Sequence, residues 1–130
     1  MANPLLLDMV TFLTDKGIVQ GDGVDAFRDF TPEAPDSLVA LHEYKGDPAV
    51  PYDTNVHRSV QISVRDKSAD KARRKALEIF KQLRSDTLIV QFTSDRWGQV
   101  HLRQTPFLLK RDENDRVTYA FNIGVTTTIE

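Results

Sequence analysis

Two strand patterns, followed directly by an amphipathic helix, limit the folds that this chain can adopt. The first is Leu38–Tyr44, which opens with four apolar residues in a row and is typical of a strand covered on both faces. The second is Val56–Arg65, where apolar and polar residues alternate as in a strand with one buried face. Ser68 then stands where a helix N-cap is expected, and apolar residues continue at helical spacing to Leu83. This order predicts a sheet covered by helices.

The remaining segments complete an α+β pattern. Asn3 as an N-cap, Pro4 at the first helical position and Gly17 as a stop predict a helix near the N-terminus. A short strand is expected within Val24–Phe30. Three more strands are expected at Thr87–Thr93, about Gln99–Lys110 and about Arg116–Ile129. We predict a single α+β domain over residues 1–130, with a mainly antiparallel sheet and two helices packed on one face.

The last two predicted strands have irregular features. Between Gln99 and Lys110 the apolar phase changes at Pro106, which predicts a bulge or an edge position there. The polar run Asp112–Asp115 predicts the turn of a hairpin. If Arg116–Ile129 is continuous, it runs about 40 Å at ~3.3 Å per residue, which exceeds the usual strand length. We therefore expect its far end to pair outside the compact core.

Composition and charge exclude several classes of function. The 130 residues include no cysteine, which excludes disulfides and thiolate chemistry. A formal net charge of −2 gives no general attraction to nucleic acids or to membrane surfaces. No basic region precedes the apolar run at the N-terminus, and Asp8 interrupts that run. We expect a soluble intracellular protein that is neither exported nor inserted into a membrane.

Residues suited to catalysis are present but badly spaced for it. Asp36 and Glu43, the latter two residues before a lysine, are the residue types with which one nuclease superfamily holds Mg²⁺. Between them lies one predicted strand, which would hold the two carboxylates about 23 Å apart at ~3.3 Å per residue. His42, His57 and His101 are isolated and lack the spacing of a metal site. We predict no enzymatic activity, no metal site and no cofactor.

The basic helix Ser68–Arg84 is the best candidate for contact with nucleic acid. Its outer face carries several cations, among them Arg74, Lys75 and Lys81, which could contact phosphates. Asp70 lies within one turn of them, however, and no aromatic residues alternate with the cations as in single-strand binders. Three interpretations stay open: a solvated helix face, a subunit interface and a nucleic-acid-binding module.

The order of several short motifs along the chain resembles that in a known family. The motifs are Pro35-Asp36 before the strand LVALHEY, Gly46 with Pro48, Gln61–Arg65, the alanine-spaced helix, Pro106-Phe107, and the turn from Arg111 to Arg116. In this order they resemble the minor-capsid or tail-completion proteins of long-tailed phages, which are related to tail terminators. The resemblance extends from the first helix to about Val125.

That resemblance implies a structural virion protein of the phage tail or neck. It implies a small α+β subunit that assembles in the host cytoplasm as a ring, commonly a hexamer. Such a ring caps the tail tube at full length and offers a docking surface to the head connector. DNA would pass through it without specific binding, and no membrane is involved. The ring size, and the choice between a terminator and a neighbouring neck protein, stay open.

Candidate contact residues lie outside the predicted core. A closed ring needs heterologous interfaces, in which one patch meets a different patch on the next subunit. Leu7 falls off the apolar face of the first helix, as an isolated exposed leucine or as a subunit contact. The long segment Lys45–Asn55 suits a docking loop. The candidate contact residues are Leu7, Tyr44, Lys45, Asp47, Tyr52, Asp53, Arg74 and Lys75.

Overall fold

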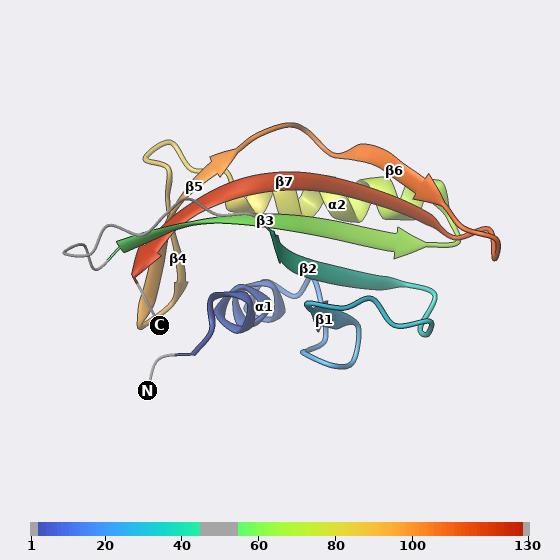
Figure 1. Ribbon diagram of the computed structural model, residues 1–130, viewed down its shortest axis with the longest axis horizontal. Helices are drawn as coiled ribbons and strands as arrows, with labels where there is room; N and C mark the ends of the chain where they lie inside the picture. The colour runs from blue at the N-terminus through green and yellow to red at the C-terminus, as the bar shows by residue number, and fades with distance from the viewer. Residues whose placement is uncertain (1–2, 45–54, 129–130) are drawn as a thin grey trace.

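The computed structural model describes residues 3–44 and 55–128, in which two helices and seven strands form an α+β fold. In chain order the elements are α1 (Leu5–Asp15), β1 (Ala26–Arg28), β2 (Leu38–Tyr44), β3 (Asn55–Asp66), α2 (Ala69–Leu83), β4 (Ile89–Thr93), β5 (Arg96–Leu102), β6 (Phe107–Arg111) and β7 (Val117–Thr128). The sheet is mainly antiparallel, as predicted, and β1 and β2 are its parallel pair (Figure 1).

The long strands β3 and β7 form the centre of the sheet. The strand order is β1-β2-β3-β7-β5-β4, and β6 also pairs with β7. β3 and β7 each have 12 residues and pair along their whole length, from Asn55 opposite Thr128 to Asp66 opposite Val117. The expectation that the far end of the last strand pairs outside the core is therefore wrong for the described residues. β3, which is as long as β7, provides backbone hydrogen-bond partners along one whole edge of β7.

The strand predicted over Gln99–Lys110 is split into β5 and β6, which pair one after the other with the same edge of β7. Pro106 lies in the connection between them, where its missing N–H costs no ladder hydrogen bond. The register shift comes later, between Leu108 and Lys110. The phase change thus marks a break between two strands. The prediction of a bulge or an edge position at Pro106 is confirmed in its second form, since β6 lies at an edge of the sheet.

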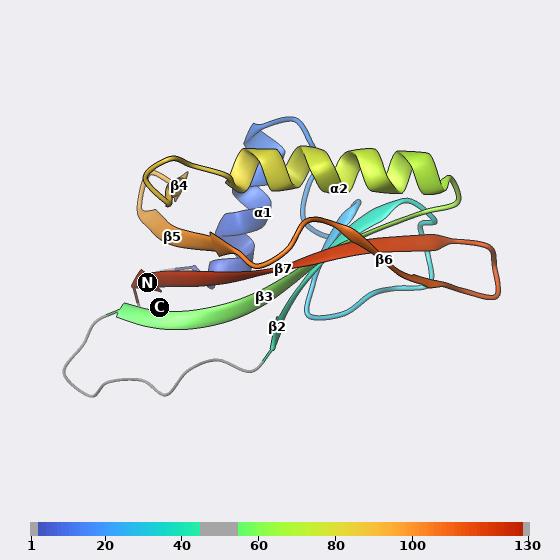
Figure 2. The same cartoon turned by 90° about the horizontal axis from the view of Figure 1, so that it is seen from above.

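Both helices cover the same face of the sheet (Figure 2). α2 packs along β3 and β7, and α1 lies against β4, β1 and β2. As predicted, Ser68 caps α2, because its Oγ accepts a hydrogen bond from the backbone N–H of Lys71 at 3.2 Å. At α1 the N-cap is Pro4 and not Asn3, while Gly17 follows the helix with φ +75°. The largest fully buried side chains between these layers include Leu5, Met9, Leu13, Ile62, Ile79, Leu83, Phe121 and Ile123.

The first four residues of β2 are buried on both faces, as their uninterrupted apolar sequence predicts. Val39 and Leu41 join the main core under the helices. Leu38 and Ala40 point the other way and form a second cluster with Phe27 of β1. We call the face of the sheet opposite the helices the helix-free face. At the β1–β2 end of the sheet, this second cluster covers the helix-free face.

Candidate assembly surfaces

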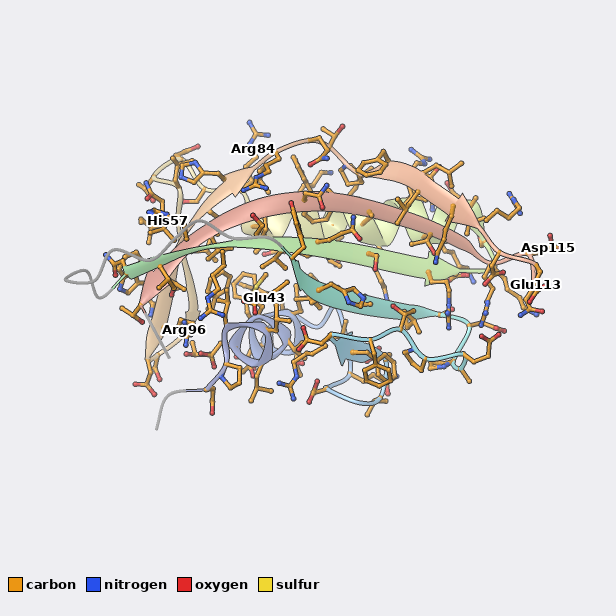
Figure 3. All side chains as sticks on the ribbon, in the orientation of Figure 1. Glu43, His57, Arg84, Arg96, Glu113 and Asp115 are labelled. Atoms are coloured by element: carbon orange, nitrogen blue, oxygen red, sulfur yellow. The ribbon has the colours of Figure 1, made fainter. Side chains whose placement is uncertain are left out.

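The helix-free face is polar and hollow near the end where β3 begins and β7 ends. Strand register places His57 of β3 beside Thr126 of β7, and Thr126 beside Gln99 of β5. A cavity of about 220 Å³ opens here, and His57 and His101 both line it. Sequence reasoning treated these two histidines as isolated, and the sheet brings them together. His57 Nδ1 lies 2.6 Å from the hydroxyl of Thr126 (Figure 3).

Arg103 lies across this face and connects three strands. Its guanidinium donates to the hydroxyl of Tyr44 on β2 at 2.9 Å and to that of Ser59 on β3 at 3.1 Å. The side chain passes over Gly124 of β7, where an added Cβ would lie 3.1 Å from Arg103 Nη2. Glycine at this position gives the guanidinium room to cross the sheet. Tyr44, a predicted contact residue, is exposed and oriented by this hydrogen bond.

The buried Arg65 holds the connection between β1 and β2 against the sheet. Its Nη2 donates to the backbone carbonyls of Pro32, Glu33 and Pro35, at distances between 2.7 and 3.1 Å. Burial lowers the pKa of Arg65, and the positive charge of Arg116 nearby lowers it further. These bonds explain why Arg65 is buried in a strand whose polar face was expected to be exposed.

Asp112 and Arg116 close the hairpin between β6 and β7. The Asp112 carboxylate accepts the backbone N–H groups of Asn114 and Arg116 at 2.9 Å each, and the Arg116 guanidinium at 2.8 Å. The Arg116 backbone N–H is the main cause that lowers the pKa of Asp112. Burial alone would lower the pKa of Arg116, but its bonds to the carboxylates of Asp112 and Glu33 raise it on balance. The turn motif seen in the sequence thus has a structural role.

The two carboxylates of the nuclease pattern bind different partners. Glu43 accepts from Nη1 of Arg58 at 3.0 and 3.2 Å (Figure 3). Asp36, before the start of β2, lies 3.6 Å from both Lys67 Nζ and Arg116 Nη1. Glu43 lies near the other end of β2, so the two side chains do not converge. Among residues 3–44 and 55–128, the structure has no group of three or more histidine or carboxylate side chains that could hold a metal ion.

The outer face of α2 is basic and partly neutralised. Arg74 is well exposed and pairs with Asp70 at 3.0 Å, and Arg73 pairs with the same carboxylate at 3.1 Å. Lys75 is half-buried along the flank of the helix. The outer face of α2 therefore carries both positive and negative charges. The contact role of Arg74 and Lys75 stays a prediction.

The other predicted contact residues need one correction. Leu7 was expected to be exposed, but it is half-buried in α1. Its role as a subunit contact stays a prediction. Lys45, Asp47, Tyr52 and Asp53 lie outside the described residues, so the docking-loop hypothesis also stays a prediction.

Two opposite edges of the sheet carry exposed apolar side chains that the sequence did not single out. On β6, Leu108 is 56% exposed and Leu109 is 42% exposed. Beside β1, Val24 is 56% exposed and Phe30 is 58% exposed. The apolar pattern did signal strands here. It could not show that these four side chains stay exposed in the described part of the chain.

A third exposed apolar pair, Leu88 and Ile89, lies where β4 begins. Leu88 has φ +65°, a conformation that bulky side chains seldom adopt. Its carbonyl accepts the N–H of Val100 at 2.7 Å, which holds the strained residue against β5.

Comparison with known proteins gives one family. A family model described as bacteriophage tail terminator protein matches residues 12–129, from within α1 to beyond the end of β7. No curated protein matches the chain. Neither helix in the described residues has the length and apolar character needed to cross a bilayer.

Proposed function

Because the chain belongs to the bacteriophage tail terminator family, we propose that it forms a homo-oligomeric ring that completes the tail tube and joins it to the head connector. Membership of the family makes the chain a structural component of the phage tail. Ring formation, docking to the connector and a position in the neck of the virion are our proposal. A hexamer is the expected ring.

The observation that carries the proposal is the pair of exposed apolar edges at β1 and β6. The strands β1 and β6 lie at opposite edges of the sheet (Figure 1), so one subunit offers two different patches. A closed ring of more than two copies requires two different, complementary patches on every copy. An isolated monomer would leave these leucine, valine and phenylalanine side chains in water.

We assign the segment that links β2 to β3 to the connector. It begins after Tyr44, which Arg103 holds on the helix-free face. Loops on a rigid scaffold commonly carry contact residues. Lys45, Asp47, Tyr52 and Asp53 are the residues that we expect to touch the partner, and Arg74 and Lys75 are expected to contact a neighbouring subunit or the tube.

We assign no catalytic step and no cofactor to this protein. The alternative function, a nucleic-acid-binding module built on α2, gains no support from the contacts there, since Arg73 and Arg74 share one carboxylate. DNA is expected to pass through the ring with no specific grip on its phosphates.

Two measurements test the proposal. Light scattering after size-exclusion chromatography, over a range of protein concentrations, is expected to give a discrete oligomer, and negative-stain images are expected to show closed rings. In the phage that encodes the chain, interruption of the gene is expected to leave tails unjoined to heads, with rescue by the wild-type gene. Normal infectious particles without the protein would contradict the proposal.

A further inference from the structure

The cavity of about 220 Å³ on the helix-free face is built from two neighbouring rows of the sheet. Each row takes one residue from each of β3, β7 and β5, and side chains two positions apart on a strand point to the same face. The residues in register are Ser59, Gly124 and His101 in one row, and His57, Thr126 and Gln99 in the next. Polar side chains from three strands therefore surround one space.

Arg103 brings a positive charge to this cavity without a matching carboxylate. Its guanidinium donates to the neutral hydroxyls of Tyr44 at 2.9 Å and Ser59 at 3.1 Å, and no carboxylate among residues 3–44 and 55–128 pairs with it. A guanidinium has five N–H donors, so three of them are left for a further acceptor. Arg58, which also lines the cavity, differs because it pairs with Glu43 at 3.0 Å.

Two histidines add donors beside this guanidinium. His57 and His101 are exposed, and both line the cavity. An imidazole keeps at least one N–H donor in either protonation state, and it is positively charged when both nitrogens are protonated. None of the described residues that line the cavity is a carboxylate. Donors and positive charge thus converge on a space that suits an anionic group.

The arrangement favours a single carboxylate over a nucleic acid. DNA owes most of its affinity for proteins to contacts between many phosphates and many cations. Apart from the paired Arg58, Arg103 is the one arginine or lysine in the described lining, and the whole chain has a net charge of −2. An arginine binds one carboxylate with two parallel hydrogen bonds, which needs no second cation.

We propose that this cavity binds an acidic side chain of the head connector, held by the guanidinium of Arg103 and by N–H groups of His57 and His101. The inference rests on the proposed function, which assigns the segment between β2 and β3 to the connector. That segment leads into β3, and His57 is the third residue of this strand. The cavity belongs to one subunit, so the site does not require a closed ring.

Titration of the full chain with a hexaglutamate peptide at low salt tests the site. Binding is followed by the side-chain NMR signals of the arginines and histidines. Arg103→Gln is expected to weaken binding about tenfold or more, the usual loss when a hydrogen bond between charged groups is removed. Gly124→Ala keeps every charge, but its added Cβ would lie 3.1 Å from Arg103 Nη2. It is expected to weaken binding several-fold by displacing the guanidinium.

The matched control makes the same substitution on another surface. Arg111→Gln removes an exposed arginine from β6, away from the cavity, and is expected to bind hexaglutamate as the wild type does. Circular dichroism checks that each variant is folded. A DNA duplex is the second probe. If it binds more tightly than hexaglutamate and loses that binding in Arg103→Gln, the site is for nucleic acid and the proposal is overturned.

A variant phage tests the identity of the partner. Arg103→Glu reverses the charge in the cavity, and it is expected to form rings as the wild type does while leaving many tails unjoined to heads. Normal joining of heads and tails in this variant would overturn the assignment to the connector.

The outcomes separate this inference from the proposed function. No binding of hexaglutamate by the wild type would overturn the site and leave the proposed ring intact. Equal weakening in Arg103→Gln and Arg111→Gln would do the same, because it would show a general effect of charge. A wild-type chain that binds hexaglutamate but stays monomeric at every concentration would contradict the ring and leave the carboxylate site in place.

Discussion

Arg96 Nε donates to Asp8 Oδ2 at 2.6 Å inside the protein, where both side chains are buried. The pair joins α1 to the start of β5 across 88 positions of sequence. The same guanidinium also donates to the carbonyls of Asn3 and Thr128 and to the hydroxyl of Thr127. One arginine thus connects the N-terminal helix to the start of β5 and the end of β7. Figure 3 shows Arg96 beside α1.

Asp8→Ala is expected to lower the free energy of unfolding by about 3–5 kcal/mol, because it leaves the Arg96 guanidinium buried without its counter-charge. Urea unfolding followed by circular dichroism measures the loss. Asp70→Ala, which removes a surface carboxylate that pairs with two arginines, is the control and is expected to cost under ~1 kcal/mol. Equal losses in the two variants would show that the buried pair contributes no more than a surface pair.

Gly98→Ala is expected to destabilise the protein by about 1–3 kcal/mol through overpacking. An added Cβ at this position in β5 would lie 2.5 Å from Phe92 Cε2 and 3.0 Å from Val125 Cγ1. Gly21→Ala is the matched control, because nothing lies within 4 Å of its added Cβ. Thermal unfolding of both variants makes the comparison, and unchanged midpoints in both would argue against close packing of Phe92 on Gly98.

Stability is expected to fall in acid partly through Asp112. Its pKa is lowered from 3.8 in the folded protein, so the carboxylate contributes stability that is present above the unfolded pKa and is lost as the pH falls through the lower folded value. Urea unfolding at a series of pH values from neutral to about 2 measures this loss. In Asp112→Asn the dependence below about pH 4 is expected to be weaker. An unchanged acid profile would assign the loss to other carboxylates.

Arg65→Met is expected to loosen the connection between β1 and β2. It removes the donor that three backbone carbonyls share, and each hydrogen bond to a charged group is worth about 1.5–3 kcal/mol. Cleavage after Glu33 by a glutamate-specific protease is expected to be several-fold faster than in the wild type. Arg28→Met, which breaks only an exposed pair, is the control. Equal cleavage rates in the two variants would mean that Arg65 does not hold this connection.

Leu88→Asn is expected to stabilise the isolated subunit by up to about 1 kcal/mol. A left-handed backbone costs an ordinary L-residue roughly 1–2 kcal/mol, and asparagine tolerates it better. Leu88 is exposed, so little apolar burial is lost. Thermal unfolding checks the direction of the change, and a lower midpoint would show that the leucine side chain makes contacts that outweigh the backbone strain.

Much of the fold could be predicted because its signals are local. The four apolar residues that open β2, the alternation of β3 and the capping serine at position 68 each express a preference of a few neighbouring residues, and each is confirmed. The polar turn before β7 is confirmed for the same reason. The prediction failed where a local pattern was assumed to continue through a break. One strand was expected across Pro106, and the structure has two strands, β5 and β6, on either side of it.

The sequence by itself determined the class of the fold, the order of the helices and of most strands, and the family. The tertiary structure decided which edges of the sheet stay open, which strand covers the end of β7 and which arginine neutralises Asp8. The periodicity of a sequence indicates which side chains prefer water. Whether a side chain is exposed, and which charge it pairs with, depends on which distant segment packs against it. Leu109 and Asp8 illustrate the difference: the first is an apolar residue left in water, and the second is a carboxylate placed in the core.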